Sequence, residues 1–187
     1  MGDVFDHIPA RHREFIAAQH VFFVATAPSD ASGRVNLSPK GLDTLRVLDP
    51  HTVAYLDFVG SGVETIAHLR ENGRIALMFC AFSGPPKIVR LHGRGEVIEP
   101  QSPRFGELRK LLPPAESARA VILVHVERAS DSCGYGVPLY AYEGERTQLP
   151  AWAARKGAEG LAQYQREKNA ESIDGLPGLA WVRGRAR

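Results

Sequence analysis

The stretch from Val53 to Phe79 reads VAYLDFVGSGVETIAHLRENGRIALMF, and the rest of the chain is organised around it. Residues 53–58 alternate loosely and are rich in β-branched and aromatic side chains, which predicts a strand. A Gly-Ser-Gly turn at residues 60–62 interrupts that strand. Because Ser61 can accept a hydrogen bond from a backbone N–H, we expect it to be the N-cap of a short helix over residues 63–71.

The unit closes at Gly73, which we expect to stop the helix by taking left-handed backbone. Residues 74–79 then predict a second strand, apolar enough to be buried on both faces. A glycine turn that opens a helix offers unpaired N–H groups and the positive end of the helix dipole, and both suit a phosphate. A plain crossover between strands has the same pattern, so both interpretations stay open.

The composition is that of an ordinary globular protein of one domain. The chain has 187 residues, 44% of them hydrophobic and 24% charged. Its formal net charge of +2 is too small to indicate a nucleic-acid or membrane partner. Two cysteines are too few for a disulfide scaffold or a four-cysteine zinc site. With no signal peptide expected at the N-terminus and no apolar run of about 20 residues, we expect a cytoplasmic protein.

Other segments show strand or helix patterns of their own. Further strands are predicted at residues 20–27, 34–40, 45–48, 87–98 and 120–129. Helices are predicted at residues 104–112, 149–169 and 3–19, where Pro9 interrupts or restarts the last of these. Pro39 predicts an edge strand, and Gly93 and Gly95 predict a bulge or bend. We expect Pro150 at the first position of the last helix and a loose tail over residues 175–187.

About six strands joined mainly by short turns favour a small antiparallel barrel with peripheral helices over a doubly wound parallel sheet. We therefore predict a mainly β fold. Residues 1–148 would form the barrel domain, and residues 149–187 would add a C-terminal helix and a basic tail.

Several stretches together carry a resemblance to a known family. They are VNLSPKG at residues 35–41, LREN at 69–72, IALMF at 75–79 and IVRLHGRGEV at 88–97. In this order and spacing, the chain resembles the pyridoxamine 5'-phosphate oxidase-like FMN-binding split-barrel family over roughly residues 10–130. The resemblance implies a six-stranded Greek-key split β-barrel that forms a homodimer, with FMN in two grooves at the dimer interface.

The resemblance also implies nine cofactor-binding residues: Asn36, Ser38, Lys40, Phe58, Val59, Glu64, Thr65, Lys87 and Ile88. Typical members place an Arg-Lys pair on the phosphate where this chain has Glu64 and Thr65. Classical members carry Arg-Gln where this chain has Lys87 and Ile88. Glu64 would repel a phosphate dianion. The C-terminal Arg and Trp pattern of true pyridoxamine phosphate oxidases is absent from the sequence, so their substrate is not carried over.

The function that the resemblance implies is an FMN-binding oxidoreductase that acts on a small molecule by hydride transfer to flavin N5. Lys40 would stabilise negative charge near N1 and the C2 carbonyl, and Ser38 could donate to the ring. Because the flavin does the difficult chemistry, no catalytic acid or base is assigned. Two other interpretations are equally open. Lys40 could be a solvated lysine on an edge strand, and Asn36 and Ser38 could be outward-facing strand residues.

Two other classes of function remain as alternatives. The first is a non-catalytic split-barrel protein that binds flavin weakly, or haem or a protein partner. The second is a reductase that uses the deazaflavin F420. His68 or His92 would be the haem ligand, although ordinary structural histidines fit the sequence better. The seven histidines include no pair at H-x-x-x-H spacing, so no metal site is predicted.

Overall fold

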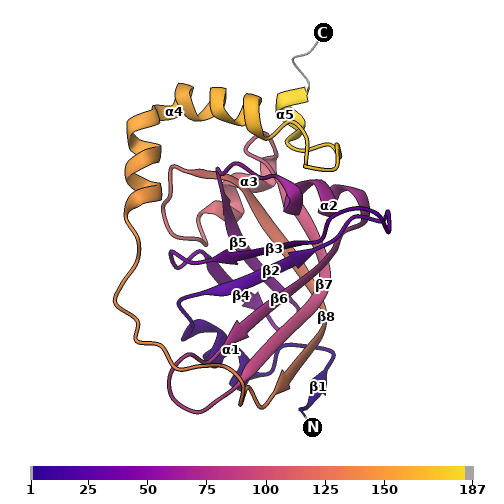
Figure 1. The fold of residues 1–187 in the computed structure, drawn as a ribbon, viewed down its shortest axis with the longest axis vertical. Coiled ribbons are helices and arrows are strands. Elements are labelled where there is room, and N and C mark those ends of the chain that lie inside the picture. Colours follow the sequence, from indigo (N-terminus) through magenta and orange to yellow (C-terminus); the bar gives the residue numbers. More distant parts are fainter. Residues whose placement is uncertain (1, 184–187) are drawn as a thin grey trace.

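A computed structural model describes residues 2–183. Within these residues, eight strands form one sheet in which the paired neighbours are antiparallel (Figure 1). The strands are β1 (Val4–Phe5), β2 (Phe22–Thr26), β3 (Asn36–Lys40), β4 (Leu45–Asp49), β5 (Thr52–Phe58), β6 (Arg74–Cys80), β7 (Ile88–Ile98) and β8 (Ala118–Ser132). Their order is β3-β2-β6-β7-β8-β5-β4, and β1 pairs with β8.

Helices lie at the ends and edges of this sheet (Figure 1). They are α1 (Ala10–Ala17), α2 (Glu64–Asn72), α3 (Pro103–Arg109), α4 (Gln148–Lys168) and α5 (Ala180–Arg183). No helix within residues 2–183 has the length and apolar character that crossing a membrane requires. The predicted mainly β fold with peripheral helices is confirmed, although eight strands replace the expected six.

The sheet curls around one apolar core to form a split barrel. Alternate residues of β2, β5, β6 and β7 point inward, and examples with essentially no exposed surface are Val24, Val53, Leu77 and Leu91. The two ends of the strand order, β3 and β4, leave the split. Pro39 lies in β3, which among the described strands pairs with β2 alone, so the predicted edge strand is confirmed.

The central unit folds largely as its sequence predicts, and its helix begins later than expected. Strand β5 leads into α2, and Gly73 ends that helix with φ 71°. The predicted N-cap is wrong, because the cap position is Val63, which makes no capping hydrogen bond with its side chain in the described structure. Gly62 and Val63 lengthen the turn, and this carries Ser61 out of the cap position.

The bend predicted in β7 is confirmed as an irregularity against β8. The pairing shifts register between His92 and Gly93. A Cβ atom on Gly93 would lie 2.0 Å from the carbonyl oxygen of His125, so only glycine permits this approach of the two strands.

The N-terminal prediction of a helix over residues 3–19 is wrong in its first part. Val4 and Phe5 pair with Ser130 and Ala129 as a short strand. The helix starts only at Ala10, after Pro9. A proline disfavours helical backbone in the residue before it, which explains why the helix does not extend back to residue 3.

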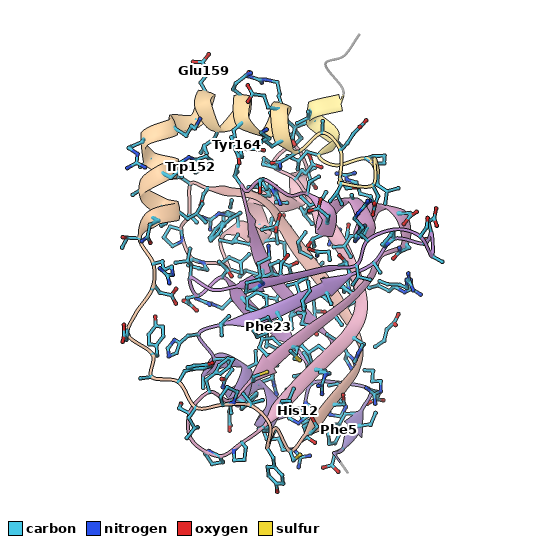
Figure 2. All side chains as sticks on the ribbon, in the orientation of Figure 1. Phe5, His12, Phe23, Trp152, Glu159 and Tyr164 are labelled. Carbon is cyan, nitrogen blue, oxygen red and sulfur yellow. The ribbon has the colours of Figure 1, made fainter. Side chains whose placement is uncertain are left out.

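The C-terminal helix α4 bends at Gly157, whose φ of 63° and ψ of 175° lie outside the helical region. The bend brings the rings of Trp152 and Tyr164 to 5.1 Å in an edge-to-face pair (Figure 2). The expected first position for Pro150 is wrong, because the helix begins at Gln148.

The segment after α4 is not the loose tail that was expected. Leu179 has no exposed surface and belongs to the barrel core, and Trp181 and Val182 pack against the same core. The last four residues, 184–187, lie outside the described residues.

Candidate functional site

A ladder of polar side chains runs along the inner face of β3. The Ser38 hydroxyl donates to Asn36 Oδ1 at 2.8 Å. The Asn36 amide nitrogen donates to the hydroxyls of Thr26 at 3.1 Å and Thr65 at 3.0 Å. Thr65 lies in the first turn of α2, so Asn36 connects the edge strand to the start of that helix. Asn36 and Ser38 therefore point toward the barrel, and the interpretation of outward strand residues is not what the structure has.

Lys40, at the end of the same strand, belongs to a buried ionic cluster. Lys40 Nζ lies 3.0 Å from Asp57 Oδ1, and Arg119 Nε lies 2.7 Å from Asp57 Oδ2. The side chain of Asp57 is fully buried, that of Arg119 is 5% exposed and that of Lys40 is 21% exposed. We call these three residues the Lys40–Asp57–Arg119 cluster. Lys40 is therefore not a solvated edge lysine.

The ionisation of Asp57 follows from this arrangement. Burial acts to raise its pKa, but the charges and hydrogen bonds of Arg119 and Lys40 outweigh burial and hold the pKa at about 2. Tyr55 lies two residues away, on the same face of β5. Its hydroxyl is buried and has no hydrogen-bond partner among the described residues, and burial raises its pKa well above the ordinary value.

Three of the nine predicted residues line one cavity of about 250 Å³: Lys40, Phe58 and Val59. Val59 also packs against Ala153 and Leu161 of α4, and Leu149 of α4 closes the cavity wall. A second cavity, of about 500 Å³, adjoins the first because Leu42 and Phe58 line both. The cavity at Lys40 is the candidate site.

The start of α2 is in contact with the C-terminal segment. Glu64 Oε1 accepts a hydrogen bond from the backbone N–H of Ile173 at 3.2 Å. The side-chain amide of Asn169 donates to the carbonyl oxygen of Gly60 at 2.9 Å. Asp174 pairs with Arg34 in the same region. Among the described residues, neither Lys40 nor Lys87 forms an ion pair with Glu64, because their carboxylate partners are Asp57 and Asp131.

Lys87 and Ile88 lie away from the other predicted residues. They are at the start of β7, where Ile88 pairs with Cys80 and Ser132. Lys87 Nζ lies 3.7 Å from Asp131 Oδ2. Strands β2 and β6 separate β7 from β3, so one chain does not bring these two residues to the cavity at Lys40.

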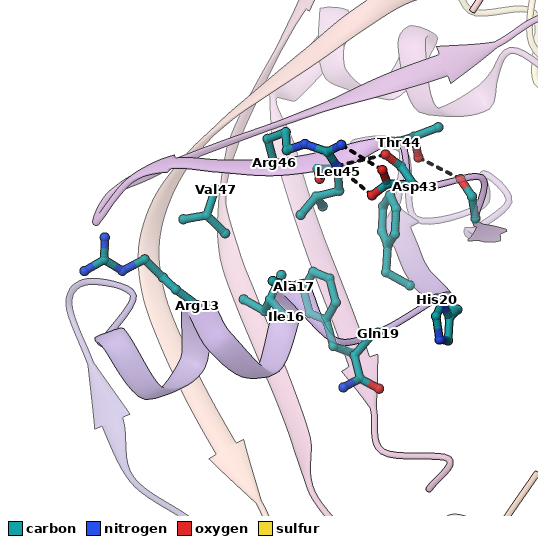
Figure 3. A pocket seen from close by; sticks show the side chains of 13 residues that line it. Arg13, Ile16, Ala17, Gln19, His20, Asp43, Thr44, Leu45, Arg46 and Val47 are labelled. Carbon is teal, nitrogen blue, oxygen red and sulfur yellow. Dashed lines mark hydrogen bonds and ion pairs between the residues drawn. The ribbon is translucent and has the colours of Figure 1, made fainter. Parts of the chain in front are cut away.

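Another pocket, of about 390 Å³, opens between α1 and β4 (Figure 3). Its walls include the apolar side chains of Ile16 and Leu45, and Arg46 donates to both carboxylate oxygens of Asp43 at 2.7 Å (Figure 3). None of the nine predicted residues lines this pocket, and its ion pair is already neutral.

Comparison with known proteins agrees with this split barrel. The family model described as pyridoxamine 5'-phosphate oxidase matches residues 8–133. The pyridoxamine 5'-phosphate oxidase family protein ustO of Aspergillus flavus is 42% identical in an alignment of 185 positions, and the alignment covers 89% of this chain and 74% of that protein. The chain therefore belongs to the pyridoxamine 5'-phosphate oxidase family.

Solved structures support the fold. A HupZ variant from Group A Streptococcus is 23% identical and has a TM-score of 0.51, over 67% of this chain and 99% of that chain. A Clostridium acetobutylicum protein related to general stress protein 26 is 12% identical with a TM-score of 0.51, over 66% of this chain and 86% of that chain. At these identities the likeness concerns the fold alone.

The residues present fit one end of a flavin and not the other. Lys40 offers a cation at a cavity that Phe58 and Val59 line, which suits the electron-rich edge of an isoalloxazine ring. At the start of α2, Glu64 brings a negative charge where a phosphate would need a cation. The cavity at Lys40 thus has a cation and apolar walls of the kind that a flavin ring needs, whereas the charge of Glu64 at the start of α2 has the wrong sign for a phosphate.

Sequence reasoning missed two members of the cluster, Asp57 and Arg119. A signal was present, because each is the charged residue at the end of a strongly apolar strand: Asp57 in VAYLDF and Arg119 before AVILV. A charge in such a run is rarely buried unless it is paired. The sequence does not show which two charges pair.

Proposed function

We propose that this protein is a flavin-binding oxidoreductase whose cofactor is FMN. The observation that carries the proposal is the cavity at Lys40. Among the described residues that line this cavity, Lys40 is the only cation, and it belongs to the buried cluster with Asp57 and Arg119. Membership of the pyridoxamine 5'-phosphate oxidase family supports the same class of cofactor.

The chemistry follows from charge. A bound flavin would supply the hydride acceptor, so this chain need only bind and orient it and exclude water. Lys40 would stabilise negative charge on the ring edge, and Ser38 would hold the polar ladder in place through Asn36. Phe58 and Val59 would give the ring its apolar contacts.

We also propose that the active form is a homodimer. Lys87 and Ile88 would reach a cavity only if a second copy supplied them. The outer face of the sheet offers an apolar surface for that copy. Pro39, Phe23 and Met78 lie in register on β3, β2 and β6, and alternation turns them away from the core. Exposed apolar surface of this kind is typical of interfaces.

The test is the visible absorbance of the purified protein, measured before and after addition of FMN and desalting. Retained bands near about 370 and 450 nm would support the proposal, since these belong to the flavin itself. A sharp band near about 400 nm would indicate haem instead. A colourless protein that releases FMN on desalting would contradict the proposal, and sedimentation of the same sample would report its oligomeric state.

A second candidate function is binding without turnover. The contact between Glu64 and Ile173 favours it, because the helix start that holds phosphate in typical relatives is bound here to the chain's own backbone. Reduction of the bound flavin by a nicotinamide cofactor would support the oxidoreductase. Stable flavin that no nicotinamide reduces would speak for the binding protein.

The charge of Glu64 gives a prediction of its own. Glu64→Gln is expected to tighten FMN binding several-fold at low salt, because it removes a charge that repels phosphate and keeps an oxygen for the Ile173 N–H. Titration of apoprotein with FMN at two salt concentrations measures the effect. The gain should shrink at high salt, and Glu159→Gln on the exposed side of α4 is the control. Equal affinities for wild type and Glu64→Gln would exclude the start of α2 from the phosphate site.

A further inference from the structure

The Lys40–Asp57–Arg119 cluster contains two cations and one carboxylate. Each carboxylate oxygen of Asp57 is already paired, Oδ1 with Lys40 and Oδ2 with Arg119. Within residues 2–183, neither cation forms an ion pair with any other carboxylate. The cluster therefore keeps an excess of one positive charge at a site where Asp57 is fully buried and Arg119 nearly so.

The position of Arg119 results from an irregularity in the sheet. Asp57 pairs with Ala120 and Phe58 pairs with Ala118, so the register shifts and Arg119 has no partner across the ladder. Such a bulge re-aims one side chain relative to the regular alternation. Here it directs the guanidinium toward Asp57, on the face of β5 that holds Tyr55.

Arg119 does not line the cavity, whereas Lys40 does. Its effect on a ligand must pass through Asp57. Without Arg119, Lys40 and Asp57 would be a neutral pair. The positive charge of Lys40 at the cavity would then be cancelled by the negative charge of Asp57. With Arg119 present, the three residues of the cluster together carry a net charge of +1, and Lys40 is the member of the cluster that lines the cavity. At the low effective dielectric of a buried site, that difference acts strongly on a ligand's charge.

We propose that Arg119 is a positioning residue that, acting through Asp57, makes the cavity at Lys40 selective for an anionic group. This inference rests on the proposed function, in which that group is the N1 edge of the flavin ring. The edge is neutral in oxidised flavin and negative in the reduced anion. The protein should therefore bind reduced FMN more tightly than oxidised FMN, and Arg119 should be needed for the difference.

The experiment compares wild type with Arg119→Met, which removes the charge, and with Arg119→Lys, which keeps it. Dissociation constants for oxidised FMN and for dithionite-reduced FMN are measured anaerobically, together with the midpoint potential of the bound flavin. Arg119→Met is expected to lower the preference for reduced flavin about tenfold, which is about 30 mV for a two-electron couple. Arg119→Lys should keep the wild-type preference. Arg13→Met removes an exposed arginine of α1 and should also leave it unchanged.

A purely structural role for Arg119 predicts another result. Both Arg119 variants would then bind oxidised and reduced flavin equally less well, and the midpoint potential would stay at the wild-type value, which would overturn the inference. Should Arg119→Met fail to fold, Arg119→Gln keeps a donor for Asp57 without the charge, and the same loss of preference is expected. A wild-type protein that binds neither form of FMN would overturn the proposed function itself. Binding by wild type with no change in any Arg119 variant would overturn only the inference.

Discussion

Asp57→Ala is expected to lower the free energy of unfolding by about 3–5 kcal/mol, the cost of removing one partner from a buried ion pair. The substitution would leave Lys40 and Arg119 without the carboxylate that both contact, at 3.0 and 2.7 Å. Equilibrium urea denaturation of wild type and variant measures the difference. Asp43→Ala is the matched control, because the Asp43 side chain is 74% exposed and its pair with Arg46 should contribute less than about 1 kcal/mol.

The same residue makes stability depend on pH, and the direction follows from its pKa. The pKa of Asp57 is lowered from 3.8 to about 2 by folding. A group whose pKa falls on folding contributes stability above its unfolded pKa, and the contribution is lost as pH drops through the folded value. Wild type should therefore lose about 2 kcal/mol between about pH 4 and pH 2 from this group. Asp57→Asn should lose less over that range, and an unchanged acid dependence would contradict a charged, buried Asp57.

The sequence predicts those parts of the fold that local patterns determine. The strand β5, the helix α2 and the left-handed Gly73 follow from neighbouring residues, and the structure has each of them. The alternation expected in β5 and the single apolar stripe expected in α2 are not reproduced, because residues 53–57 and 65–69 are all buried. The candidate site is only partly local. Of the residues that the family resemblance groups together, Lys40 of β3 shares a cavity with Phe58 and Val59 at the end of β5, whereas Asn36 and Ser38 are not among the residues that line it.

Arg119 could not be placed from the sequence for a physical reason. Its contact with Asp57 spans 62 positions and depends on a one-residue shift between β5 and β8. A shift of one residue exchanges the two faces of a strand, so regular alternation assigns this side chain to the wrong face. Lys87 and Ile88 are a different case. The family resemblance groups them with Lys40, but within a single chain they lie away from Lys40.

The composition of the C-terminal segment, rich in glycine and arginine, predicts a loose tail, and the structure packs the segment against the barrel core instead. Gly178 serves this close packing. A Cβ atom on Gly178 would lie 2.3 Å from the carbonyl oxygen of Asn169, so a side chain there would force the two segments apart. The adjacent Leu179 donates its N–H to the same carbonyl at 2.9 Å and inserts into the core. The segment is thus fixed at the start of α2, beside Glu64.

Leu179→Ala is expected to cost about 2–5 kcal/mol of unfolding free energy, the range for truncating a buried leucine. Leu179 has no exposed surface, so its removal leaves a cavity between the barrel core and the C-terminal segment. Thermal or urea unfolding measures the loss. Ile173→Ala, in the same segment and 64% exposed, should stay within about 0.5 kcal/mol of wild type. Equal small effects for both would mean that the segment is held only by surface contacts. A large loss for Leu179→Ala alone would mean that the residues over α2 are part of the barrel core, so that any ligand reaching Glu64 must compete with folded structure.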